Sequence, residues 1–184
     1  LLQKYNVEFL KIGLIESFEI LDRLLDYLLD QDKRLKIIWD PILKASAGFS
    51  FHRYTPEDQE RLKRILDRVY LITPNTDELY RLFGEGITPD RLQIVCRDHH
   101  LNILWKGGHN AGVDDVLFQP DRTTNFSVPR SRYTKHGTGC TLSSALLSAL
   151  AQGDALATSC NKAQLYVSRF IESNNSLLGY HCIG

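Results

Sequence analysis

The residues best suited to chemistry lie in the stretch Lys135–Leu147, which reads KHGTGCTLSSALL. Gly137 and Gly139 permit positive φ angles and let a ligand approach the backbone closely. Leucines and alanines recur at helical spacing directly after them, so the stretch predicts a loop that becomes a helix. The residues at the start of that helix are Gly137, Thr138, Gly139 and Cys140.

The start of a helix offers unpaired backbone N–H groups and the positive end of the helix dipole, which together favour an anion. Cys140 would lie in this first turn, where its thiol is a candidate general base. The plain alternative is a capping turn with a small packed cysteine. The stretch alone leaves both interpretations open, and it matches neither the Walker A loop nor G-x-G-x-x-G.

Other polar residues follow short apolar stretches and suit phosphoryl transfer, which depends on charge neutralisation and positioning. Lys106 could bridge phosphates as a point charge. Asp40 and Glu78 carry the hard oxygen ligands that Mg²⁺ prefers. Each also has a structural interpretation: Asp40 could cap a turn, Asn75 and Glu78 could cap a helix, and Lys106 could be a solvated loop lysine. His99, His100 and His109 are expected to be surface or hydrogen-bonded residues rather than metal ligands.

Short apolar strands alternate with amphipathic helices along the chain. The pattern predicts strands at 7–13, 35–39, 70–73 and 102–105, a hairpin over 113–129, and helices at 18–29, 55–68, 77–83, 88–99, 138–152 and 154–173. The core face of the last helix is predicted to hold Ala157, Cys160, Leu165, Val167 and Phe170. This alternation is typical of an α/β fold with a mainly parallel sheet between two helical layers. Ligands in such folds bind beyond the carboxyl ends of the strands, where the polar clusters at Gly13, Asp40, Thr73–Glu78 and Lys106–His109 should meet.

Composition narrows the class of protein. The 184 residues suit one domain, and 22 basic residues balance 22 acidic ones, which argues against binding to nucleic acid or a membrane surface by bulk charge. The cysteines form no C-x-x-C pair, so neither a zinc site nor a disulfide framework is indicated, and a reducing, cytoplasmic setting fits. The four are Cys96, Cys140, Cys160 and Cys182. No apolar run is long enough to span a membrane.

The motifs KIGLIES, WDPILKASAGF, LITPNTDE, LWKGGH and KHGTGCTLSSAL occur in an order and spacing that resemble one family. The chain is similar throughout to the hydroxymethylpyrimidine and phosphomethylpyrimidine kinases of thiamine biosynthesis, in the ribokinase-like superfamily. The resemblance implies that Cys140 is the catalytic base and that Gly137, Thr138 and Gly139 form an anion hole. It also implies that Lys106 and Gly107 of KGGH bind phosphate. By the same resemblance, Asn75 and Glu78 of N-x-x-E organise Mg²⁺ and nucleotide phosphates, and Asp40 lies near the metal.

The resemblance implies ATP-dependent phosphorylation of 4-amino-5-hydroxymethyl-2-methylpyrimidine and then of its monophosphate, with Mg²⁺, by a homodimer. Pyridoxine or pyridoxal kinase is the alternative enzyme, and a catalytically incomplete ATP-binding module is the alternative outside catalysis. Family members carry a Gly-rich segment that supplies much of the pyrimidine pocket, and no such stretch precedes KIG here. We therefore expect residues 1–184 to be a single ribokinase-like domain without its N-terminal segment, with little activity alone.

Overall fold

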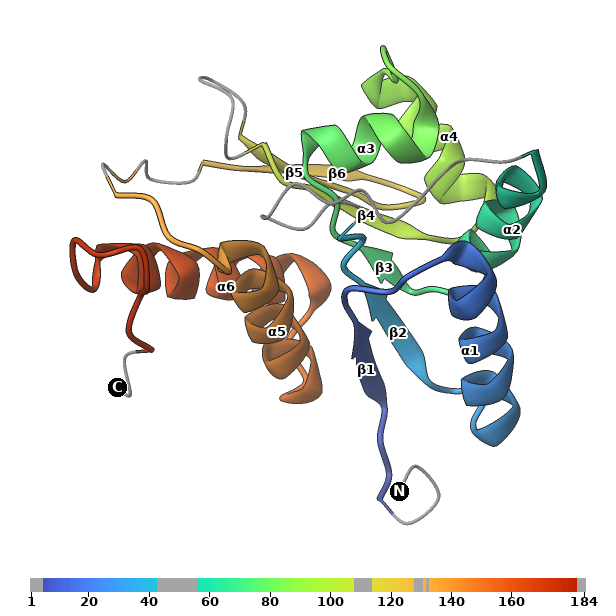
Figure 1. Ribbon diagram of the computed structural model, residues 1–184, viewed down its shortest axis with the longest axis horizontal. Coiled ribbons are helices and arrows are strands. Elements are labelled where there is room, and N and C mark those ends of the chain that lie inside the picture. Colours follow the sequence, from blue (N-terminus) through green and yellow to red (C-terminus); the bar gives the residue numbers. More distant parts are fainter. Residues whose placement is uncertain (1–4, 43–55, 108–113, 128–130, 132, 182–184) are drawn as a thin grey trace.

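The computed structural model describes residues 5–42, 56–107, 114–127, 131 and 133–181 (Figure 1). The strands in these residues are β1 (Phe9–Ile12), β2 (Lys36–Trp39), β3 (Leu71–Ile72), β4 (Asn102–Trp105), β5 (Asp115–Phe118) and β6 (Thr123–Phe126). The helices are α1 (Phe18–Gln31), α2 (Pro56–Leu66), α3 (Thr76–Phe83), α4 (Pro89–Asp98), α5 (Thr138–Ala151) and α6 (Leu156–Glu172). Every element predicted within the described residues is present, with ends shifted by a few residues.

The strands form one sheet in the order β1-β2-β3-β4-β5-β6. The pairs from β1 to β4 are parallel, and the hairpin of β5 and β6 adds two antiparallel strands at one side. The register sets Ile12 beside Trp39 and Trp39 beside Ile72. The carboxyl ends of the parallel strands therefore lie along one edge of the sheet, as the sequence predicted.

Helices cover both faces of the sheet, which confirms the predicted three-layer α/β fold (Figure 1). The first core cluster packs α1, α2, α3 and α4 against one face, around Trp39 and Ile72. The second packs α5 and α6 against the other face, around Ile38 and Leu104. Because neighbouring strand residues enter different cores, the strands are apolar on both sides and read as continuous hydrophobic runs. In α6 the expectation for Leu165 was wrong, since 48% of it is exposed and Ala163 takes a core position instead.

Local sequence explains where several helices begin. Ser17 caps α1 by accepting a hydrogen bond from the backbone N–H of Ile20, and Thr88 caps α4 ahead of Pro89. α5 differs because Gly137 stands at its N-cap with a φ of 79° and has no side chain to cap the helix. The first N–H groups of α5 are thus left for another acceptor.

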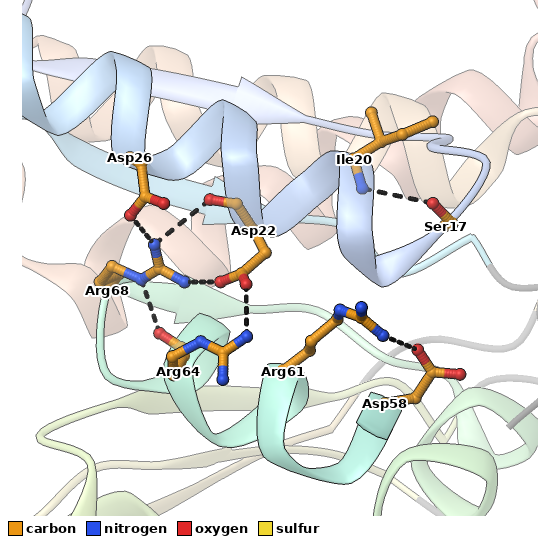
Figure 2. Close-up of polar contacts among 8 residues, drawn as sticks. All are labelled: Ser17, Ile20, Asp22, Asp26, Asp58, Arg61, Arg64 and Arg68. Atoms are coloured by element: carbon orange, nitrogen blue, oxygen red, sulfur yellow. Dashed lines mark hydrogen bonds and ion pairs between the residues drawn. The ribbon is translucent and has the colours of Figure 1, made fainter. Parts of the chain in front are cut away.

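Helices α1 and α2 are joined by a cluster of ion pairs at the surface (Figure 2). Arg64 donates to the Asp22 carboxylate at 2.6 Å, while Arg68 contacts the carboxylates of both Asp22 and Asp26. Burial raises the pKa of Asp22, but hydrogen bonds from the two arginines outweigh it and leave this pKa below its ordinary value. The cluster fixes α2 against α1.

Candidate active site

Asp40 follows β2 directly and is 1% exposed, at the carboxyl edge of the sheet. Its Oδ1 accepts hydrogen bonds from the Thr73 hydroxyl at 3.1 Å and from the Lys106 ammonium at 3.0 Å. Its Oδ2 accepts from the Ser143 hydroxyl at 2.9 Å. Four segments far apart in the sequence therefore converge on one buried carboxylate, and an interpretation of Asp40 as a turn cap alone is wrong.

A second lysine, Lys11 of β1, approaches the same carboxylate. Its Nζ lies 3.9 Å from Oδ2 of Asp40 and 3.4 Å from both the carbonyl oxygen of Cys140 and the hydroxyl of Ser144. Lys11 thus connects the edge strand of the sheet to the first turn of α5. The strand is otherwise apolar, and that single lysine within VEFLKIG was the signal that could have marked it.

Lys106 follows β4 and is held in place by its backbone as well as by Asp40. Its N–H donates to the carbonyl of Pro74 at 2.8 Å, and the residue forms an isolated bridge with Asn75. A Cβ atom added to Gly139 would lie 3.4 Å from the Lys106 Nζ. The ammonium group therefore lies against the glycine loop, which comprises residues 137–140 at the start of α5. The alternative interpretation of Lys106 as a solvated loop lysine is wrong, since only 13% of its side chain is exposed.

Cys140, the last residue of the glycine loop, lines a surface groove. Gly137 takes a left-handed backbone conformation, with φ at 79°, and Cys140 is exposed. The groove has a volume of about 680 Å³. Its lining comes from one face of α5, from α6 and from the end of the described chain: Cys140, Thr141, Ser144, Ala145, Ser148, Ala149, Gln152, Lys162, Tyr166 and His181. The thiol is therefore accessible beside the first turn of a helix.

Asn75 and Glu78 form a complete capping box at the start of α3. The Asn75 side chain accepts from the N–H of Glu78 at 2.9 Å, and Oε2 of Glu78 accepts from the N–H of Asn75 at 2.8 Å. Burial raises the pKa of Glu78, while the charge of Lys106 and the Asn75 N–H oppose this and the charge of Asp40 adds to it. The helix-cap interpretation is confirmed, and Lys106 and Asp40 act electrostatically on this carboxyl.

Gly107 is held in place by a second buried carboxylate, that of Asp115. Its N–H donates to Oδ1 of Asp115 at 3.0 Å, while the amide of Gln164 donates to Oδ2 at 2.9 Å. Burial raises the pKa of Asp115, although both hydrogen bonds and Lys106 act against that rise. Gln164 lies on α6, so the KGGH segment is connected to the helical layer. Gly108 and His109 of that motif lie outside the described residues, as does Cys182.

The carboxylates near the glycine loop differ in how well they suit a magnesium ion. Among the described residues, no three His, Cys, Asp or Glu side chains are grouped closely enough to hold a metal. Mg²⁺ often binds through one or two carboxylates with waters and substrate phosphates completing its shell. Glu78 fits this pattern, because its helix cap uses only one carboxylate oxygen. Asp40 fits less well, since hydroxyl and ammonium groups already hold both of its oxygens.

The predicted site residues thus fall into one region. Asp40 contacts Lys106, Lys106 lies against Gly139 and bridges Asn75, and Glu78 caps the helix that Asn75 begins. Sequence reasoning missed the roles of Lys11, Ser143 and Asp115. Ser143 lay within the recognised TLSSA motif, but its contact spans 103 residues and depends on how α5 packs.

The profile of the family described as phosphomethylpyrimidine kinase matches residues 1–183. The chain belongs to this family. The thiamine biosynthesis bifunctional protein ThiED of Geobacter sulfurreducens is 33% identical over 174 residues, which cover 90% of this chain and 35% of that protein. The crystal structure of phosphomethylpyrimidine kinase from Clostridium difficile 630 aligns with a TM-score of 0.66 at 27% identity, over 88% of this chain and 68% of that chain.

The pyridoxal kinase of Staphylococcus aureus in complex with pyridoxal aligns with a TM-score of 0.75 at 21% identity, over 95% of this chain and 66% of that chain. This likeness shows that the two chains share a fold. The chain spans about a third of the ThiED protein and about two thirds of each solved kinase. Family and fold, both expected from the sequence, are thereby confirmed.

Proposed function

We propose that the protein carrying this chain is an ATP-dependent kinase of 4-amino-5-hydroxymethyl-2-methylpyrimidine and its monophosphate. The observation that supports this most is the Lys106 ammonium, held by Asp40 and set against Gly139 at the start of α5. A cation beside the uncapped N–H groups of a helix start is suited to a transferring phosphoryl group. Family membership supports the pyrimidine substrate.

In the proposed reaction Cys140 accepts the proton of the substrate hydroxyl while that oxygen bonds to the γ-phosphorus of ATP. The bond from the γ-phosphorus to the bridging oxygen breaks, and ADP leaves. The N–H groups of Gly137, Thr138 and Gly139 stabilise charge on the transferring group, and Lys106 and Gly107 bind phosphate oxygens. For the second phosphorylation the acceptor is an oxygen of the substrate's phosphate group. This oxygen is already negatively charged, so no proton has to be removed from it.

Mg²⁺, when bound, would neutralise nucleotide phosphates. We propose Glu78 as the carboxylate that holds it, with Asp40 acting mainly by orienting Lys106. Glu78 would have to give up its proton for this role. Because its pKa is raised, the affinity for Mg²⁺ should increase as the pH rises above 4.5, the ordinary pKa of the group.

Pyridoxal kinase is the second candidate, and the fold similarity to the Staphylococcus aureus enzyme is the observation that favours it. A homodimer and a cytoplasmic location complete the proposal, since two-fold assemblies are the commonest and an accessible thiol base needs a reducing compartment. Among the described residues, no helix combines the length and apolar character needed to cross a bilayer.

The test uses the protein as its gene encodes it, with ATP and Mg²⁺, and compares the pyrimidine alcohol, its monophosphate, pyridoxal and ribose. The proposal expects turnover of the two pyrimidines above the others, and preferred turnover of pyridoxal would select the second candidate. Cys140→Ala should lower kcat by about 10²–10⁴, the usual contribution of a positioned base, while ATP binding persists. Near-normal kcat in that variant would assign the proton to another group.

A further inference from the structure

Lys135 lies two residues before the glycine loop and is buried, with 8% of its surface exposed. Its ammonium donates to the backbone carbonyl of Asn174 at 2.6 Å, to the side-chain carbonyl of Asn174 at 3.2 Å and to the backbone carbonyl of Ser176 at 2.5 Å. All three acceptors are neutral oxygens. Burying a cation costs free energy, so these dipoles must offset the loss of water.

The acceptors belong to a turn that follows the C-terminal end of α6, where the helix dipole favours a positive charge. The turn is itself organised, because Oδ1 of Asn174 also accepts from the N–H and the hydroxyl of Ser176, each at 2.8 Å. A second connection lies beside the first, since the N–H of His136 donates to the carbonyl of Leu177 at 2.9 Å. Residues 135 and 136 are thus bound to the turn at 174–177.

The glycine loop needs such a connection. Gly137 adopts a left-handed conformation at the N-cap of α5, and no side chain there caps the helix, so the chain before α5 has wide conformational freedom in the absence of other contacts. Beyond the loop, α5 packs against α6 in the second core cluster. With Lys135 in place, both ends of the loop are held by α6 and by the turn that follows it.

We propose that Lys135 is a positioning residue that fixes the conformation of the glycine loop before a phosphoryl group binds there. Amides that already converge bind a phosphoryl group without the cost of ordering a flexible loop. The inference rests on the proposed function only in taking the loop's ligand to be a phosphoryl group. The competing explanation is that Lys135 contributes to general stability and has no particular effect on the loop.

The experiment compares Lys135→Met, which keeps the length of the side chain and removes the charge, with Lys135→Arg, which keeps the charge. Lys63→Met is the matched control, because Lys63 is an exposed lysine paired with Glu60 on α2. Hydrogen exchange of the nucleotide-free protein reports on amides 136–141. We expect faster exchange there in Lys135→Met, little change in α1, and most of the protection retained in Lys135→Arg.

Binding of Mg–ADP by calorimetry gives the functional measurement. Lys135→Met should bind about 10- to 100-fold more weakly, the usual effect of losing charge-assisted hydrogen bonds that hold a site. In Lys135→Ala, methylammonium chloride should restore part of this affinity, because it can reach the vacated oxygens. Tetramethylammonium chloride at the same ionic strength cannot donate a hydrogen bond and should not.

Equal loop exchange in Lys135→Met and Lys63→Met would overturn the inference, as would a uniform increase over the whole protein. Loop exchange that increases as expected in a protein without kinase activity would overturn the proposed function and leave the positioning role intact. Urea unfolding of each variant identifies any that fails to fold, and Lys135→Ala then replaces Lys135→Met in the comparison of loop exchange with Lys63→Met.

Discussion

Two aspartates in this protein face two cations each, and the difference between them indicates where chemistry is possible. Asp22, on α1, pairs with Arg64 and Arg68 where α1 meets α2 (Figure 2). Asp40 lies at the carboxyl edge of the sheet with Lys106 and Lys11. Each aspartate has two cationic partners, so the number of ion pairs by itself does not distinguish a functional site from a structural one.

The two clusters differ in burial and in the cations they use. Asp40 is 1% exposed and receives hydroxyl groups from Thr73 and Ser143 in addition to its lysines. Arginine grips a carboxylate with a planar fork, whereas lysine presents a compact charge that can also face a ligand. The arginine cluster is thus complete in itself and joins two helices. The lysine cluster holds an ammonium against a glycine loop, where another anion can be received.

The largest effect is expected from Lys106→Met. This change leaves the Asp40 carboxylate buried with one fewer partner, and breaking a buried ion pair costs roughly 3–5 kcal/mol of unfolding free energy. It also removes a cation from the proposed phosphate site, which should lower kcat/KM by about 10²–10³. Steady-state kinetics and urea unfolding measure the two effects. Wild-type kinetics in a folded variant would show that the lysine cluster, like the arginine cluster, is only structural.

Arg68→Met tests the arginine cluster, which should affect stability and leave catalysis unchanged. It removes the contacts of Arg68 to Asp22 and Asp26 at the α1–α2 junction, which is partly open to solvent. Solvent screening limits the loss of unfolding free energy to about 1 kcal/mol, and kcat should remain at the wild-type value. Urea unfolding and the kinase assay test this together. A large loss of kcat would mean that the packing of α1 and α2 reaches the site.

Whether a contact could be predicted from the sequence depends on how far apart its two residues lie along the chain. The spacing of apolar residues and the capping residues depend only on neighbours within a few positions of the chain. For this reason Ser17, Thr88 and the capping box at Asn75 predict the starts of their helices correctly. The site residues could be grouped because parallel strands end at one edge of the sheet. The contact of Ser143 with Asp40 could not be predicted, since it depends on how α5 packs against the sheet. The contact of Lys11 with Asp40 depends instead on the pairing of β1 with β2, which the local pattern of VEFLKIG does not specify. Leu165 was placed in the core because apolar character alone does not fix the rotation of α6.

The smallest effect is a difference in how the two regions respond to pH. The pKa of Asp22 is lowered on folding, so its ion pairs stabilise the protein above the ordinary pKa of 3.8 and lose this effect as the pH falls below it. The pKa of Glu78 is raised by burial, so above pH 4.5 the native state retains more of this proton than the unfolded chain does. Its contribution therefore declines as the pH rises above 4.5.

Asp22→Asn and Glu78→Gln should consequently change opposite ends of the stability profile. Asp22→Asn should reduce the loss of unfolding free energy that occurs as the pH falls below 3.8. The reduction should be less than about 1 kcal/mol, because solvent screens this cluster. Glu78→Gln keeps a side chain that can complete the helix cap and should reduce the decline that begins as the pH rises above 4.5. Urea unfolding from pH 3 to 8 measures both profiles against the wild type. If Glu78→Gln instead steepened the decline towards neutral pH, the carboxyl would be ionised in the native state, and the buried charge of the site would need to be assigned differently.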